Sequence, residues 1–376
     1  MSITYLSFDG ALEPLGHSQI VQPLLKLAER GFDIRLLTLE RTRAGAGVLQ
    51  AQLLDAGIRW KSAPLKGTLS NLASLAALAL EGKQTQLLHA RSLPAAIVAL
   101  AVQKSLQAKL LFETRVHWAR QRRAQGKLPG IQYGIALGLE AAALRRADAL
   151  VMRTELAAQD LQSENAFCIP PLADEGAFTL QRRQGEAPDG LRAGPLVLGF
   201  VGSVNADYLI DATLALWVRI AKQRSEAMFY AVTPQQDALR ARLRAIGGSD
   251  ERVVFSTLPH EEMPRALSWI DWGLMLLRSG ERRRASMPKK LGEFLLAGVR
   301  PVQHGGNSEV SDWVRRAGTG IALDRLDLDA AAHGILNGQF SSLAEGRQVA
   351  MDHFALSSGV ERYAAVWNQL LRNTNG

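Results

Sequence analysis

The chain has a single cysteine, Cys168, among its 376 residues. One cysteine excludes an internal disulfide and a zinc site built from cysteines, and it suits a reducing compartment. Long apolar runs are also missing: the longest, Leu69–Leu80 and Leu93–Val102, fall short of the roughly 20 residues that span a bilayer. No basic residue precedes Lys26, so we expect no signal peptide. These absences predict a cytoplasmic protein, either free or peripheral on the inner face of the cell membrane.

Common catalytic and nucleotide-binding motifs are missing as well. There is no P-loop, H-E-x-x-H or G-x-S-x-G, and the spacing of Gly10 and Gly16 does not fit G-x-G-x-x-G. The seven histidines show no metal-ligand spacing. Asp327-Leu328-Asp329 mimics the D-x-D of metal-dependent sugar transferases, but we interpret it as the N-cap of a helix. The sequence therefore predicts neither a bound metal nor a cofactor.

Acidic residues are absent from one long segment, and the net charge of +8 is unevenly distributed. Residues 1–164 carry 20 Lys/Arg against 13 Asp/Glu, a net of +7. No Asp or Glu lies between Thr114 and Leu139, whereas five basic residues do: Arg115, Arg120, Arg122, Arg123 and Lys127. A basic first half predicts contact with an anionic acceptor or with anionic membrane lipid, and not with nucleic acid. A merely solvated basic surface explains the charge as well.

Short apolar runs alternate with amphipathic helical stretches along almost the whole chain, which is typical of parallel sheets covered on both faces. The alternation breaks at 175–194, a segment rich in glycine and charge. The expected strands are Ile3–Phe8, Ile34–Leu39, Leu87–Ala90, Leu110–Glu113, Ala149–Met152, Leu196–Val201, Met228–Val232, Val253–Phe255, Gly273–Leu277, Arg300–Gln303 and Gly320–Leu323.

We therefore predict an α/β protein with two doubly wound Rossmann-like domains that face each other across a cleft. The N-terminal domain covers residues 1–174, a linker 175–194, and the C-terminal domain 195–357. Residues 358–376 form a last helix that either domain could bind, and we expect it to pack back on the N-terminal domain.

In open α/β sheets, ligands bind at the loops that follow the carboxyl ends of strands. The first strand runs into Phe8–Gln19, a loop with two glycines, and we expect His17 or Ser18 near the N-cap of the helix that follows. Backbone N–H groups at such a helix start can hold a phosphate. The second domain opens in the same way, where Gly202 permits a ligand to approach the backbone. A tight turn would explain each glycine alone.

Polar side chains follow the strand Leu110–Glu113. Glu113, Arg115 and His117 alternate in sequence, so they share one face if the strand continues. A hydrogen-bonded surface histidine is the ordinary explanation for His117, and its place at a strand end favours a functional role to the same degree.

The densest pattern is Ser286–Val302. We expect a helix to start at Pro288, with Lys290 and Glu293 accessible on one face. A cation near a helix N-terminus suits a diphosphate, and a carboxylate one turn later suits two ribose hydroxyls. A surface ion pair would explain the two charges, but not the serine, proline and glycine around them.

These residues resemble the two-Rossmann (GT-B) glycosyltransferases of group 1, family 4, over most of the chain. Bacterial members begin with E-P-L-G-H-S-Q, here Glu13–Gln19, followed by A-R-S, here Ala90–Ser92, and an acidic-x-Arg strand end, here Glu113–Arg115. Their second domain shows G-S, here Gly202-Ser203, and then S-x-P-x-K-x-G-E-x-L-x-x-G, here Ser286–Gly298. The first and last motifs are the specific ones.

The resemblance implies a retaining, metal-independent hexosyltransferase. The second domain would hold a nucleoside-diphosphate sugar, and the first would bind a glycan or lipid-linked acceptor. The residues expected to bind the donor are Gly16, Gly202, Ser203, Ser286, Lys290 and Glu293. Those expected at the reacting sugar are His117 and Arg115, and those expected to bind the acceptor are His17, Arg91, Glu113 and Arg120.

One position departs from the family pattern. Many members have a second Glu eight residues before the one that matches Glu293, where this chain has Ala285, and the nearest acid is Glu281. Relatives with the S-x-P-x-K pattern lack that Glu too, so its loss does not imply inactivity. Two alternatives stay open: a non-catalytic glycosyltransferase-like binding or partner protein, and another two-Rossmann nucleotide-sugar enzyme such as an epimerase.

Overall fold

The computed structural model describes residues 2–81, 84–114, 118–124, 126–192, 194, 196–278, 280, 286–305 and 308–372, apart from the side chains of Gln121 and Ala124. The chain forms two compact units. Unit 1 consists of Met1–Leu172, Arg284–Ser286 and Leu356–Gly376, and unit 2 of Ala173–Arg283 and Met287–Ala355.

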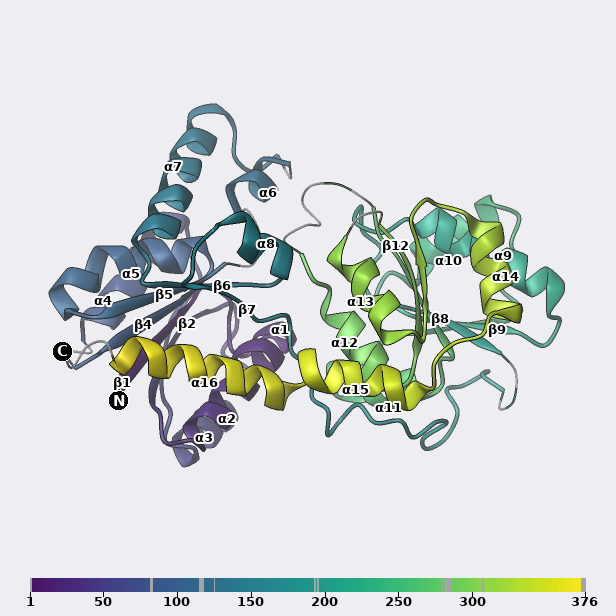
Figure 1. Cartoon of the computed structure of the whole chain (residues 1–376), viewed down its shortest axis with the longest axis horizontal. Coiled ribbons are helices and arrows are strands. Elements are labelled where there is room, and N and C mark those ends of the chain that lie inside the picture. The colour runs from purple at the N-terminus through teal and green to yellow at the C-terminus, as the bar shows by residue number, and fades with distance from the viewer. Residues whose placement is uncertain are drawn as a thin grey trace. The chain divides into compact units, whose positions relative to one another are not determined.

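Unit 1 is a parallel sheet of seven strands in the order β3-β2-β1-β4-β5-β6-β7. One face packs on α2, α3 and α16, and the other on α4, α5 and α7 (Figure 1). The strands are β1 (Ser2–Ser7), β2 (Asp33–Glu40), β3 (Arg59–Pro64), β4 (Leu87–Arg91), β5 (Lys109–Glu113), β6 (Ala149–Met152) and β7 (Ala166–Cys168). The helices are α1 (Pro14–Gly16), the π-helix η1 (His17–Val21), α2 (Gln22–Ala28), α3 (Ala46–Asp55), α4 (Thr68–Leu80), α5 (Leu93–Leu106), α6 (Trp118–Ala124), α7 (Gly130–Arg146), α8 (Glu155–Asp160) and α16 (Leu356–Arg372).

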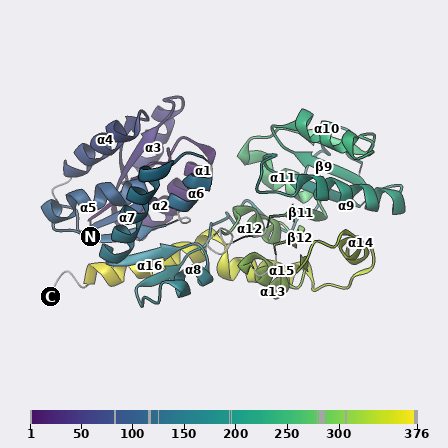
Figure 2. The ribbon, with the colours of Figure 1, turned by 90° about the horizontal axis from the view of Figure 1, so that it is seen from above.

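Unit 2 is a parallel sheet of six strands in the order β10-β9-β8-β11-β12-β13. Its faces are covered by α11, α12, α13 and α15 on one side and by α9, α10 and α14 on the other (Figure 2). The strands are β8 (Val197–Val201), β9 (Met228–Val232), β10 (Val253–Ser256), β11 (Trp272–Leu276), β12 (Arg300–His304) and β13 (Ile321–Leu323). The helices are α9 (Ile210–Gln223), α10 (Gln236–Ala245), the 3-10 helix η2 (His260–Glu262), α11 (Met263–Ser268), α12 (Lys289–Leu296), α13 (Glu309–Ala317), α14 (Leu328–Asn337) and α15 (Leu343–His353).

The predicted α/β fold is confirmed, and every strand expected from an apolar run is present to within one residue at each end. Two strands were not expected, and both lie at a sheet edge: β3 and β7. Edge strands bury less surface: β3 alternates the exposed Arg59 and Lys61 with the buried Trp60, and β7 is only three residues long and half-buried. Within the described ranges, no helix has the length and apolarity needed to cross a membrane.

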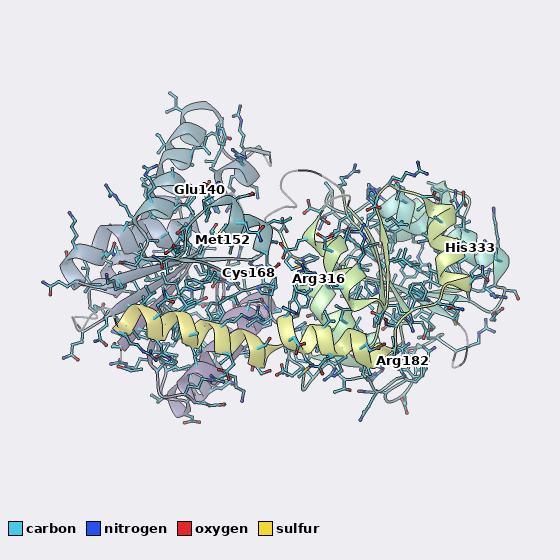
Figure 3. All side chains as sticks on the ribbon, in the orientation of Figure 1. Glu140, Met152, Cys168, Arg182, Arg316 and His333 are labelled. Atoms are coloured by element: carbon cyan, nitrogen blue, oxygen red, sulfur yellow. The ribbon has the colours of Figure 1, made fainter. Side chains whose placement is uncertain are left out.

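The segment 175–194, expected as a linker, belongs to unit 2. Phe178 and Leu191 are buried in the core of that unit. Arg182, labelled in Figure 3, lies 2.5 Å from a carboxylate oxygen of Asp271, and Arg183 lies 3.2 Å from the other. The charged residues that made the segment resemble a linker therefore bind it to unit 2.

A buried ion pair lies where β4 and β5 end in unit 1. Nη1 of Arg91 is 2.5 Å from Oε1 of Glu113, and each residue is 2% exposed. Burial by itself raises the pKa of Glu113, but the charge of Arg91 and the hydrogen bond from His89 outweigh burial, so the pKa lies well below its usual range. Each charge compensates the other in an interior that excludes water.

The same pair holds the loop after β1 and the C-terminal helix α16. Arg91 donates a hydrogen bond to the carbonyl oxygen of Gln19 at 3.3 Å. Oε2 of Glu113 accepts hydrogen bonds from the hydroxyl groups of Tyr363 on α16 at 3.1 Å and Tyr5 on β1 at 3.3 Å. Strand β1, the π-helix η1 and helix α16 thus meet at one ion pair.

A second contact with α16 involves His89. Nε1 of Trp367 donates to Nδ1 of His89 at 3.2 Å. Because an indole N–H can only donate, the neutral imidazole carries its proton on Nε2, which is 3.3 Å from Oε2 of Glu113. The Trp367 side chain is fully buried and meets the ring of Phe32 edge-on, so α16 is an integral part of unit 1.

Acidification is expected to destabilise unit 1 in two stages. Burial lowers the pKa of His89 below its usual 6.5, so stability is present above about pH 6.5 and is lost as the pH falls below it. The lowered pKa of Glu113 removes further stability as the pH falls below its usual 4.5. Hydrogen exchange of peptides from β4, β5 and α16, corrected for the intrinsic rate, should show weaker protection in each stage.

The substitution Glu113→Gln measures how much the Arg91–Glu113 ion pair contributes to stability. It leaves Arg91 buried without an anionic partner and should cost about 3–5 kcal/mol of unfolding free energy at neutral pH. Glu29→Gln, which breaks the exposed pair of Glu29 with Lys26, is the control and should change stability little. A Glu113→Gln protein as stable as the parent would contradict this account of unit 1.

Candidate functional site

The loop after β8 brings Gly202 and Lys290 together at the carboxyl end of a central strand. Gly202 has a φ of +128°, and a Cβ at that position would lie 2.7 Å from Nζ of Lys290. The ammonium donates to the carbonyl oxygen of Val201 and, at 3.1 Å, to the hydroxyl of Tyr208. It also lies 4.6 Å from the centre of the Tyr208 ring. A half-buried cation therefore sits where α/β sheets bind ligands.

Within the described residues, Lys290 has only uncharged partners. No carboxylate of the described residues pairs with it, and its contacts are two neutral oxygens and aromatic faces. Hydrogen bonds between ionised groups are stronger than those to neutral oxygens, so an anion would be a better partner. This end of β8 is the natural place in unit 2 for an anionic ligand.

The local sequence explains why Lys290 reaches this position. Pro288 precedes the first turn of α12, as expected, and Gly298 follows its last turn in the left-handed conformation with a φ of +68°. Leu291, Phe294 and Leu295 anchor the helix in the core. The first turn is thereby fixed with Lys290 directed at β8.

Glu293 pairs with Lys289 and not with Lys290. Its Oε1 is 2.9 Å from Nζ of Lys289, which also lies 2.9 Å from Nε2 of His260. That Oε1 accepts no well-aligned hydrogen bond. Glu293 is only 9% exposed, so our expectation of an accessible surface position is wrong; α12 packs against α15 and is buried on most sides.

The sequence analysis did not single out three residues that lie around Lys290 and Glu293: Lys289, His260 and Tyr208. The spacing of Lys289 and Glu293, four residues apart, is typical of a helical ion pair and could have revealed the first. His260 of η2 and Tyr208 of the segment before α9 approach α12 only in the folded chain, so no local sequence pattern indicates them.

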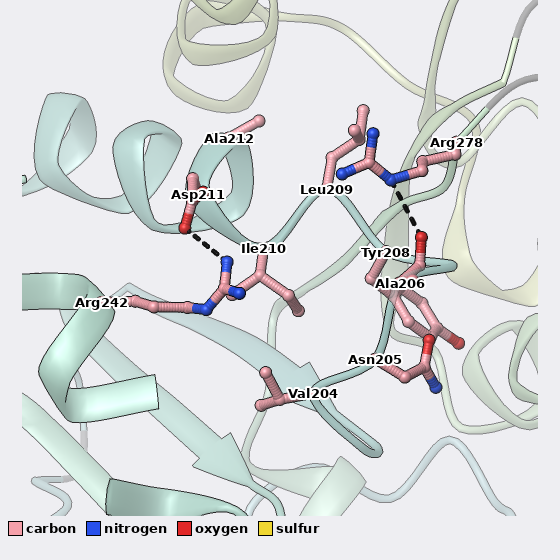
Figure 4. A pocket seen from close by; sticks show the side chains of 10 residues that line it. All are labelled: Val204, Asn205, Ala206, Tyr208, Leu209, Ile210, Asp211, Ala212, Arg242 and Arg278. Atoms are coloured by element: carbon pink, nitrogen blue, oxygen red, sulfur yellow. Dashed lines mark hydrogen bonds and ion pairs between the residues drawn. The ribbon is translucent and has the colours of Figure 1, made fainter. Parts of the chain in front are cut away.

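A pocket of about 320 Å³ opens beside Tyr208 (Figure 4). Nε of Arg278 donates to the carbonyl oxygen of Ala206 at 2.9 Å, and Arg242 pairs with Asp211 at the same distance. The lining residues are Val204, Asn205, Ala206, Tyr208, Leu209, Ile210, Asp211, Ala212, Arg242 and Arg278. Since Tyr208 both lines the pocket and accepts from Lys290, the pocket adjoins the cation.

The other residues expected to bind the donor are Ser203 in unit 2 and Ser286 and Gly16 in unit 1. Ser203 is exposed and accepts a hydrogen bond from Asn205. Ser286 is half-buried and belongs to unit 1. A Cβ at Gly16 would collide with the carbonyl oxygen of Gly10, so close packing of the loop on itself already explains this glycine.

The first loop of unit 1 differs from the expectation. Helical structure begins at Pro14, so His17 and Ser18 lie inside the π-helical turn η1 and are not N-cap residues. The carboxylate of Glu40 accepts hydrogen bonds from the backbone of the loop, the shorter being 2.7 Å from Ala11, and this fixes the early start. His17 is half-buried, with Nε2 3.0 Å from Nε2 of Gln22.

The residues expected to touch the acceptor are also placed differently. Arg91 and Glu113, expected at the acceptor, are buried in the interior of unit 1, where each compensates the charge of the other. Arg120 is exposed on α6. Four residues singled out from the sequence lie outside the described ranges: Arg115, His117, Glu281 and Ala285.

The D-x-D look-alike is a helix cap, as predicted. The side chain of Asp327 accepts from the backbone nitrogens of Asp329 and Ala330 at the start of α14. In the part of the chain that the structure describes, no group of three or more His, Cys, Asp or Glu side chains could hold a metal ion.

Comparisons with known proteins match one family model and several solved structures. Residues 21–167 match the glycosyl transferase 4-like domain. No curated protein sequence matches the chain significantly.

The matches with solved structures cover nearly the whole chain. HepE from Anabaena, crystallised with UDP-glucose, has a TM-score of 0.72 at 14% identity, over 98% of this chain and 100% of that chain. Sucrose-phosphate synthase from Thermosynechococcus elongatus has a TM-score of 0.69 at 14% identity, over 99% of both chains. A protein assigned as a UDP-N-acetylglucosamine 2-epimerase from Listeria monocytogenes has a TM-score of 0.61 at 11% identity, over 97% of this chain and 94% of that chain. Residues 21–167 therefore resemble a glycosyl transferase 4-like domain, and the two α/β units of the chain match the fold of GT-B glycosyltransferases.

Proposed function

We propose that the chain is a retaining hexosyltransferase that takes its sugar from a nucleoside-diphosphate sugar. The observation that carries this proposal is the half-buried Lys290 ammonium at the end of β8, whose partners among the described residues are all uncharged. The UDP-glucose bound to HepE, a protein of the same fold, supports this class of donor. The acceptor in this proposal is anionic or lipid-linked, and the reaction takes place in the cytoplasm.

A diphosphate fits the chemistry at the end of β8. Lys290 stands in the first turn of α12, whose free N–H groups add the positive end of the helix dipole. Gly202 has no side chain that would occupy the space beside the ammonium. In the complex, Lys290 exchanges neutral acceptors for phosphate oxygens and gains a charge-assisted bond.

A ribose fits Glu293 one turn later. Its Oε1 is buried 2.9 Å from the Lys289 ammonium without a well-aligned hydrogen bond, and a carboxylate can accept hydrogen bonds from two vicinal hydroxyls. Lys289, one turn earlier on the same helix face, holds the carboxyl group in place, and His260 of η2 contacts Lys289 in turn. The two α12 residues would thus bind neighbouring parts of one nucleotide.

The reaction we propose needs no metal ion. The acceptor hydroxyl oxygen bonds to the anomeric carbon on the face from which the diphosphate leaves, and the bond between that carbon and the diphosphate oxygen breaks. The hydroxyl proton passes to the leaving diphosphate, whose growing negative charge Lys290 stabilises. From the family resemblance, we assign His117 and Arg115 to the reacting sugar and His17 and Arg120 to the acceptor.

Two other activities are compatible with the same fold. The similarity to an epimerase-like structure means that the fold alone does not separate sugar transfer from epimerisation. A non-catalytic protein could bind a nucleotide sugar at the same cluster. Product analysis with a nucleotide sugar and a mixed acceptor extract separates them, since transfer gives a glycosylated acceptor, epimerisation a new free sugar, and a binding protein neither.

Glu293→Gln should weaken the binding of nucleoside diphosphates roughly tenfold or more, because hydrogen bonds to a charged group contribute about 1.5–3 kcal/mol each. Isothermal titration with the nucleotide chosen by a thermal-shift screen measures the loss. A sugar phosphate that lacks ribose should be indifferent to the substitution.

The matched control is Glu251→Gln, an exposed acid of unit 2 away from α12. Circular dichroism and melting temperature establish that both variants fold. If Glu293→Gln binds the nucleotide as tightly as the parent, α12 is not the donor site.

Lys290→Ala should weaken a nucleoside diphosphate more than it weakens the bare nucleoside, since the ammonium faces phosphate only. The expected loss for the diphosphate is about tenfold or more. Lys222→Ala, an exposed lysine on α9, should leave both affinities unchanged. Equal losses for nucleoside and diphosphate would show that Lys290 supports the fold of the site and not the phosphate.

His117→Ala should lower kcat on the order of 100-fold with little change in nucleotide affinity, because a group beside the reacting sugar acts mainly in the transition state. His333→Ala, an exposed histidine of α14, is the control. If the turnover of His117→Ala equals that of the parent, His117 does not act at the reacting sugar.

A further inference from the structure

Helix α7 presents an apolar face to solvent. Ile131, Ile135 and Leu139 follow one another at intervals of four residues, and they are 83%, 58% and 38% exposed. Glu140 is the only charged residue between Gly130 and Leu144, and it is buried at 5% exposure. Side chains spaced by four lie on the same side of a helix, so the three form one continuous stripe.

The stripe is separate from the face of α7 that packs in the core of unit 1. The adjacent face of α7 carries Ala136 and Ala143, which are buried, and α7 packs there against α5. Glu140, labelled in Figure 3, accepts backbone hydrogen bonds from Trp118 at 2.6 Å and Ala119 at 3.4 Å, which fixes α6 to α7. The helix is therefore anchored with its larger apolar side chains directed outward, the reverse of an ordinary surface helix.

Basic residues border the stripe at both ends. Arg122, Arg123 and Lys127 precede α7, and Arg145 and Arg146 form its last turn. Among the residues that the structure describes, none of these five is paired with a carboxylate. An apolar stripe with unneutralised cations at each end matches a surface that is apolar and anionic at once.

We propose that this α6–α7 surface, the stripe Ile131, Ile135 and Leu139 with the basic residues at its ends, docks on a membrane that contains anionic lipids. The stripe enters the boundary between headgroups and acyl chains, and the arginines and the lysine contact the headgroups. Both α6 and α7 stand out from the sheet of unit 1, so the surface is accessible within that unit (Figure 1). The inference stands on this surface alone and does not depend on sugar transfer.

A second copy of the chain is a poorer occupant. A two-fold axis that paired the stripes would bring the basic end of one α7 next to a basic end of the other, whether the helices ran parallel or antiparallel. Like charges at short distance repel, and no described acidic residue on the exposed face of α7 offsets them.

Flotation of the full-length protein with lipid vesicles tests the proposal. Neutral phosphatidylcholine vesicles are compared with vesicles in which a third of the lipid is phosphatidylglycerol, at low and high salt. The protein should bind the anionic vesicles more tightly, and salt should weaken that binding. Ile131→Ser with Ile135→Ser should lower the partition coefficient roughly tenfold or more, because the apolar contact is lost.

Leu69→Ser is the matched control, because Leu69 lies on helix α4 of the same unit and is also 83% exposed. It should leave the partition coefficient unchanged, whereas Arg122→Gln with Arg123→Gln should lower it on anionic vesicles only. Equal binding to both vesicle types, or a stripe variant that binds like the parent, would overturn the proposal. So would a parent dimer in analytical ultracentrifugation that the stripe variant dissociates. Nucleotide titration of the stripe variant separates this outcome from the donor site, which should be unaffected.

Discussion

The Arg91–Glu113 ion pair is the interaction around which unit 1 is organised. Both groups are removed from water, so each depends on the other for compensation. Through this ion pair, the π-helix η1, the ends of β4 and β5, and helix α16 are held together. The C-terminal residues therefore complete a domain that begins at the N-terminus.

Unit 2 places a cation at the corresponding end of its sheet but does not neutralise it. Lys290 reaches the end of β8 and finds a carbonyl oxygen, a phenol and two rings, while the acid nearest in sequence, Glu293, is paired with Lys289. The Arg91 guanidinium is compensated by the carboxylate of Glu113. The Lys290 ammonium has no carboxylate partner among the described residues, which leaves a place for an external anion. The contrast between the units, more than the fold, is what assigns the donor to unit 2 in our proposal.

Much of the fold follows from sequence pattern, because buried parallel strands are short apolar runs bounded by turns. The edge strands β3 and β7 do not, since little of their surface is buried. At the site, the pairing of Gly202 with Lys290 agrees with the motifs, and the cap at Asp327 follows from its spacing. The interior position of Arg91 and Glu113 could not be predicted, because it depends on side chains from α16 that meet them only in three dimensions.

The central claim is that Lys290 and Glu293 together bind one nucleoside diphosphate. A crystal structure of the protein with the diphosphate chosen by thermal shift tests it most directly. The account predicts a phosphate oxygen within hydrogen-bond distance of Nζ of Lys290, with the ribose hydroxyls on the carboxylate of Glu293. A nucleotide bound away from α12, with Lys290 still on the carbonyl oxygen of Val201, would contradict it.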